Sequence, residues 1–191
     1  YAAGAVQPGD EDDYFQSSLF TIARRRILWL LILVLANGLT TKVIAMNDQI
    51  LKEIVLLAAF IPLLIGTGGN VGAQSSTVVI RGLSTQKLKS LGAVKAVVKE
   101  AITGALLGVL MMLVVFPFAW WQGEGPLIAS AVGISLISIT TLAATTGAIL
   151  PLLFDKMRLD PALMSSPFIT TVTDIAGVFI YLNTAKWLLS S

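Results

Sequence analysis

Long apolar segments separated by short polar connections dominate the hydrophobic pattern of this chain. An α-helix rises 1.5 Å per residue, so about 20 apolar residues cross the ~30 Å hydrocarbon core of a bilayer. Five segments approach or exceed that length: residues 27–46, 50–71, 96 or 101 to 121, 127–154 and 165–189. The pattern predicts an all-α, polytopic membrane protein with five transmembrane helices.

Small and amide residues interrupt the pattern in residues 62–81, PLLIGTGGNVGAQSSTVVIR. The segment contains Gly66, Gly68, Gly69, Asn70, Gly72 and Gln74. Glycine at this density, after Pro62, predicts a broken or kinked helix, which a membrane tolerates where backbone is buried in protein or lines a water-filled cavity. The alternative is close helix packing through Gly68 and Gly72, which have the Gly-x-x-x-Gly spacing.

Asp174 is the acidic residue placed deepest in an apolar segment. It lies about nine residues into segment 165–189, or roughly 13 Å deep, and Lys186 is about three turns away. A carboxylate at that depth normally faces a bundle interior or an aqueous path. Helical spacing places four residues on the same side of the helix as Asp174, namely Thr170, Thr171, Gly177 and Tyr181.

Carboxylate and hydroxyl oxygens in this stripe suit a hard cation that prefers oxygen ligands. Two other interpretations stay open. Asp174 could be a structural carboxyl group that is protonated or hydrogen-bonded, and each threonine could donate to its own backbone.

Composition excludes several function classes. The 191 residues are 55% hydrophobic and 13% charged, with mean hydropathy +0.84 and neither cysteine nor histidine. Disulfides, zinc sites and thiol or imidazole catalysis are therefore excluded, and any metal must be held by oxygen. GTGGNVG lacks the Gly-Lys-Ser/Thr ending of a phosphate-binding loop. We predict no enzymatic activity and no nucleic-acid partner, and we expect membrane lipid around the helices.

The basic residues divide unequally between the two sides of the predicted membrane. One side holds Arg24, Arg25, Arg26, Arg81, Lys87, Lys89, Lys95, Lys99, Lys156 and Arg158, and the other holds Lys42, Lys52 and Lys186. The positive-inside rule puts the N-terminus in the cytoplasm and, with five spans, the C-terminus outside the cell membrane. Residues 1–21, with an acidic cluster, are predicted to be a cytoplasmic linker or the end of a connecting helix, and residues 22–191 the transmembrane domain.

Three separated motifs resemble the transmembrane domain of the MgtE family of magnesium channels and transporters. They are GTGGNVGAQSSTVVIRGL at 66–83, LDPA at 159–162 and SPFITTVTD at 166–174. The resemblance implies a homodimer with a cation path along the subunit interface. It implies further that Asp174 of both subunits attracts a largely hydrated Mg²⁺, with Asn70, Gly66 and Gly69 close by.

The resemblance also implies a function and further domains. It favours a channel that conducts Mg²⁺ down its electrochemical gradient, and the alternative is an exchanger coupled to protons or sodium. Mn²⁺, Co²⁺ and Ca²⁺ prefer oxygen ligands as well and are not excluded by residue type. Members of the family usually carry a cytoplasmic amino-terminal domain and a CBS pair that sense Mg²⁺, which we expect in the full-length protein.

Overall fold

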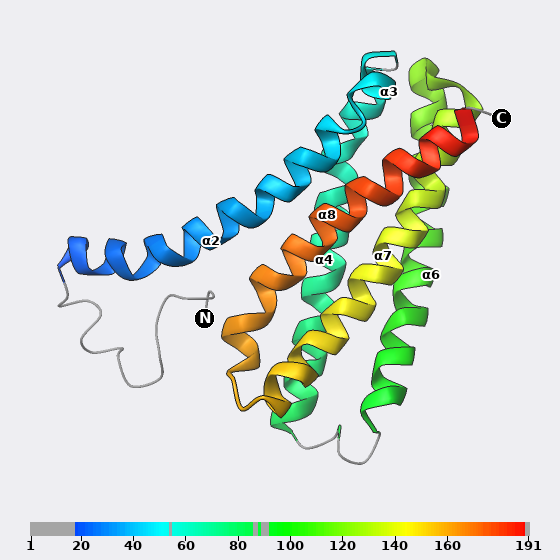
Figure 1. Cartoon of the computed structure of the whole chain (residues 1–191). Coiled ribbons are helices and arrows are strands. Elements are labelled where there is room, and N and C mark those ends of the chain that lie inside the picture. Colours follow the sequence, from blue (N-terminus) through cyan, green and yellow to red (C-terminus); the bar gives the residue numbers. More distant parts are fainter. Residues whose placement is uncertain (1–17, 54, 86–87, 89–91, 190–191) are drawn as a thin grey trace.

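The computed structural model describes residues 18–53, 55–85, 88 and 92–189, and their regular elements are all helical (Figure 1). The long helices are α2 (Leu19–Ala45), α4 (Leu56–Ser84), α6 (Ala93–Ala119), α7 (Gly125–Lys156) and α8 (Pro161–Leu189). A short helix α3 (Asp48–Glu53) and a π-helical turn η1 (Trp120–Glu124) join them. The all-α prediction is confirmed. Most of the predicted linker 1–21, and both Lys87 and Lys89, lie outside the described residues.

Four helical stretches of the described chain are long and apolar enough to cross a membrane: Leu56–Ser84, Ala93–Gln122, Gly125–Lys156 and Ser165–Leu189. The last ends at Leu189 as predicted, while helix α8 begins before the predicted segment, at Pro161. In α2 the side chains that the structure describes without a gap form the apolar stretch Leu30–Ala45. Four of the five predicted crossings are therefore confirmed by length and composition, and the crossing by α2 stays a prediction.

The second predicted span has the wrong bounds. Residues at its predicted start belong to the separate helix α3, and α4 continues past residue 71 to Ser84. The helix is unbroken through Pro62 and all four glycines of the segment, so the predicted break is wrong. The reason is that hydrocarbon offers no other partner to backbone N–H and C=O groups, so the hydrogen bonds of a helix outweigh the poor helix propensity of glycine.

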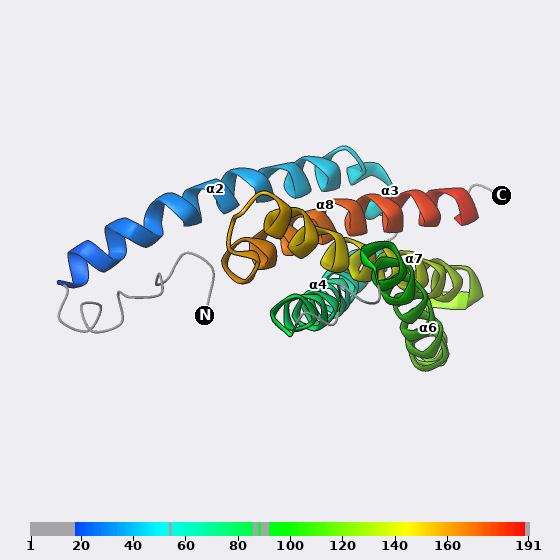
Figure 2. The same ribbon diagram turned by 90° about the horizontal axis from the view of Figure 1, so that it is seen from below.

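Helix α7 lies at the centre of the bundle and contacts α4, α6 and α8 (Figure 2). It is the most buried of the four membrane-length stretches, and α6 at the edge is the least. Small residues on α7, such as Ala143, Ala144 and Gly147, are fully or almost fully buried. These residues let neighbouring backbones approach closely, as the composition of this span predicted.

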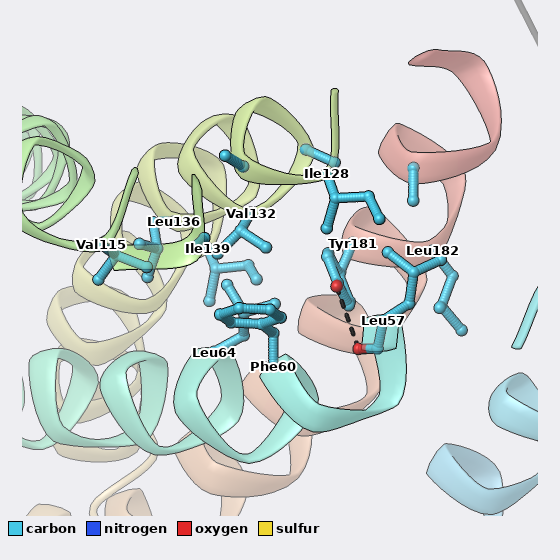
Figure 3. Packing of buried hydrophobic residues seen from close by; sticks show 14 of the residues in the cluster. Leu57, Phe60, Leu64, Val115, Ile128, Val132, Leu136, Ile139, Tyr181 and Leu182 are labelled. Carbon is cyan, nitrogen blue, oxygen red and sulfur yellow. Dashed lines mark hydrogen bonds between the residues drawn. The ribbon is translucent and has the colours of Figure 1, made fainter. Parts of the chain in front are cut away.

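A cluster of large apolar side chains joins α4, α7 and α8 (Figure 3). Within it, the hydroxyl of fully buried Tyr181 donates a hydrogen bond of 3.0 Å to the Leu57 carbonyl oxygen. Tyr181 therefore belongs to the core, and its predicted place in a polar stripe with Asp174 is wrong. Its hydroxyl has the hydrogen-bond partner that a buried tyrosine requires, and the bond fixes α8 against the start of α4.

Candidate functional site

Asp174 lies near the middle of α8, which runs from Pro161 to Leu189. Its side chain is half-buried. Among the described residues, no hydrogen-bond or ion-pair partner of the Asp174 carboxylate is found. The interpretation of Asp174 as a structural carboxyl group held by hydrogen bonds is therefore not supported. Its acceptor oxygens remain available to a ligand.

The two threonines one turn before Asp174 differ in their surroundings. Thr170 is exposed, and its hydroxyl donates to the carbonyl oxygens of Pro167 at 3.0 Å and Ser166 at 3.3 Å. Donation uses the proton of the hydroxyl and leaves oxygen lone pairs for a cation or its water shell. Thr171 is half-buried. The expectation that such threonines donate a hydrogen bond to their own helix is therefore confirmed for Thr170. This hydrogen bond still allows the Thr170 hydroxyl oxygen to act as an acceptor.

The glycines of α4 fall on two different faces. A Cβ atom on Gly68 would lie 2.8 Å from Ile139 Cγ2 of α7, and one on Gly72 would lie 3.2 Å from the Ala143 carbonyl oxygen. A Cβ on Gly66 or Gly69 would meet nothing within 4 Å. Close packing therefore explains Gly68 and Gly72, as the Gly-x-x-x-Gly interpretation predicted, and it does not explain Gly66 or Gly69.

Contacts between α4 and α8 set the relative depth of the predicted site residues. A Cβ on Gly68 of α4 would contact Thr173 of α8, and a Cβ on Gly72 would contact Ile169 of α8. As the residue number increases along α4, the number of the contacting residue on α8 decreases, so the two helices are antiparallel. At this register Asp174 lies level with residues 66 and 67, and Thr171 lies level with Asn70.

The same register shows what the fold does not bring together in one chain. Asn70 is exposed and lies about 200° around α4 from Gly68, the residue that packs against α8. No hydrogen bond joins Asn70 to Asp174 among the described residues. The predicted site residues therefore share a depth but do not form a closed site within a single chain.

The described part of the chain contains no group of three or more acidic, cysteine or histidine side chains that could hold a metal ion. A cation beside Asp174 would take one carboxylate from this chain, and the remaining ligands would be hydroxyl, amide, carbonyl or water oxygens. Mg²⁺ usually keeps several waters and binds through one or two carboxylates, so this donor set suits it as cargo.

Sequence reasoning missed a second carboxylate inside the bundle. Ser75 of α4, whose side chain is 4% exposed, donates a 2.8 Å hydrogen bond to Oε2 of Glu100 on α6. The bond links two helices that otherwise have few contacts. The available signal was an acidic residue at the start of an apolar span, after Lys95 and directly after Lys99.

We expect Glu100→Leu to destabilise the protein by about 1 kcal/mol, because the buried Ser75 hydroxyl loses its acceptor. Glu100→Gln should retain most of the stability, since its amide oxygen can accept the same bond. Thermal unfolding of both variants in one detergent measures the difference. Equal midpoints for the two variants and the wild type would show that the bond contributes nothing.

Four apolar helices packed around small residues, with a carboxylate halfway along one of them, define a multi-pass α-helical membrane protein. The chain belongs to the MgtE family, described as divalent cation transporters, whose profile matches residues 61–184. The matched residues include Gly66, Gly69, Asn70, Thr170, Thr171 and Asp174. The resemblance seen in the sequence is thereby confirmed.

Curated relatives agree with this assignment. Magnesium transporter MgtE of Thermus thermophilus is 37% identical over 166 residues, covering 87% of this chain and 37% of the relative. The Bacillus subtilis protein of that name is 34% identical over 176 residues, covering 92% and 39%. The Enterococcus faecalis protein of that name is 35% identical over 168 residues, covering 86% and 36%. The chain thus spans a little over a third of the length of these relatives.

Proposed function

We propose that two copies of this chain form a magnesium channel, with the Mg²⁺ path between them and Asp174 of both copies at its narrow part. The observation that carries the proposal is a half-buried carboxylate at the middle of a membrane-length helix, without a partner in the described chain. Such a group is costly in hydrocarbon and is normally retained on an ion pathway.

Incomplete coordination within one chain supports the dimer. One carboxylate is available at this depth, while Asn70 of α4 is exposed and a Cβ on Gly66 would meet nothing within 4 Å. A two-fold axis beside α4 and α8 doubles the carboxylates and covers the exposed polar side chains. Burial against a second copy also explains why Gly66 and Gly69 have open space around them in one chain.

Magnesium is the proposed cargo because the site is wide and built from oxygen. Mg²⁺ gives up its waters reluctantly, so paired carboxylates acting through a hydration shell suit it better than a tight cage. The names of the three relatives point to the same ion. Mn²⁺, Co²⁺ and Ca²⁺ are candidate competitors in the same path. We place the protein in the cell membrane with its amino-terminal side in the cytoplasm, where the sensor domains of the full-length protein act.

The purified protein in liposomes should conduct Mg²⁺ with neither a proton nor a sodium gradient. We expect Mg²⁺ entry, reported by an enclosed dye, to increase with an inside-negative potential, and planar bilayers to show single-channel currents. Empty liposomes are the control. Uptake that requires an imposed proton or sodium gradient would contradict the channel and support the exchanger.

A further inference from the structure

The outer surface of α6 near its N-terminal end carries apolar and polar side chains in two neighbouring rows. One row is Val94, Val98 and Ile102, and the other is Lys95, Lys99 and Thr103. Residues four apart follow one another along a helix, so each row is continuous. The rows line a shallow groove with a volume of about 370 Å³, named here the α6 groove.

The α6 groove faces away from the bundle. On another side of α6, buried Gly104 and Gly108 pack against Thr140 of α7. Figure 2 shows α6 at the edge of the bundle. The apolar row continues beyond the groove with exposed Leu106 and Leu113. This outer surface therefore meets the hydrocarbon of the bilayer.

Positive charge in the α6 groove is not balanced by the chain. Lys95 and Lys99 are exposed and have no ion-pair partner among the described residues. The adjacent carboxylate of Glu100 accepts its hydrogen bond from Ser75 on α4 instead. Further basic residues lie at the same end of the bundle, where Arg81 is in the last turn of α4 and Lys156 in the last turn of α7 (Figure 1).

We propose that the α6 groove binds an anionic phospholipid from the leaflet at this basic end of the bundle. The phosphate lies between Lys95 and Lys99, and an acyl chain follows the apolar row past Val98 and Ile102. Lysines at a membrane boundary extend their ammonium groups toward lipid phosphates while their methylene groups cover apolar surface. Each basic residue close to an anionic membrane surface adds to the attraction, which a zwitterionic lipid lacks.

Native mass spectrometry of the purified protein, mixed with equal amounts of phosphatidylglycerol and phosphatidylcholine, tests the proposal. We expect the wild type to retain phosphatidylglycerol at least roughly tenfold more than phosphatidylcholine, as two lysines at the membrane surface should provide. The double variant Lys95→Gln, Lys99→Gln should lose most of this preference. The matched control Lys42→Gln, Lys186→Gln removes the same charge from exposed lysines at the opposite end of the bundle and should keep the preference.

Two outcomes would overturn the proposal. One is equal retention of phosphatidylglycerol by the groove variant and the control variant. The other is displacement of the lipid by soluble glycerol phosphate at the same concentration, which would indicate a site for free phosphate. Unchanged thermal unfolding of the groove variant in phosphatidylcholine confirms that it is folded, because both substituted side chains are exposed.

Discussion

Asp174→Asn is expected to lower Mg²⁺ flux by at least roughly tenfold while leaving the protein folded. A unit negative charge about 5 Å from a divalent cation attracts it by about 1.7 kcal/mol in water and about 6.6 kcal/mol at the effective dielectric constant near a protein surface. Each 1.4 kcal/mol corresponds to a factor of ten in occupancy. The proposed dimer loses two such charges.

The fold should tolerate this change because asparagine has nearly the same shape. The half-buried Asp174 carboxylate has no hydrogen-bond partner among the described residues, so none is lost. Asp174→Glu is the matched variant that keeps the charge, and it should retain more flux than Asp174→Asn. Dye-reported uptake in liposomes, at equal amounts of reconstituted protein, measures both. Flux at the wild-type level in Asp174→Asn would remove this residue from the ion path.

Gly147→Ala is expected to destabilise the protein, because the added methyl group has no space between α7 and α4. A Cβ on Gly147 of α7 would overlap the carbonyl oxygen of Gly72 on α4 and lie 3.0 Å from its carbonyl carbon. These are backbone atoms, so the two helices must separate to accommodate the methyl group. Overpacking of this kind costs roughly 1–3 kcal/mol, and a backbone obstacle places the expected cost at the upper end.

Gly38→Ala is the control, because it adds the same methyl group inside helix α2 at a position where nothing lies within 4 Å. Alanine is the better helix former by up to about 1 kcal/mol, so the stability of this variant should equal or exceed that of the wild type. Thermal unfolding in detergent compares the two variants. Equal midpoints would show that α4 and α7 do not pack as closely as the structure indicates.

Most of the membrane helices could be predicted from the sequence because each depends on local composition alone. A run such as residues 165–189 is apolar over the thickness of a bilayer whatever it packs against, and helix α8 contains this run and ends with it at Leu189. The depth of Asp174 follows from its position in that run. The family could also be recognised from motifs that are contiguous in the chain, and the comparison over residues 61–184 confirms it.

The face on which each residue lies could be decided only by the tertiary structure. The sequence offered packing through Gly68 and Gly72 as one of two interpretations, and their contacts with α7 and α8 decided between the two; Gly66 and Gly69 lack such contacts. The sequence did not show that Tyr181 donates to the Leu57 carbonyl oxygen, a residue 124 positions away.

The physical reason is that the insertion of a segment into hydrocarbon and the packing of one helix against another depend on different parts of the chain. Burial in hydrocarbon depends on the composition of one segment, so the sequence by itself determined the class of protein, four of its membrane helices and the intramembrane carboxylate. Packing depends on which side chains of other helices fill the space beside a residue. The unbroken α4, the division of its glycines between two faces and the Ser75–Glu100 bond were therefore decided by the tertiary structure.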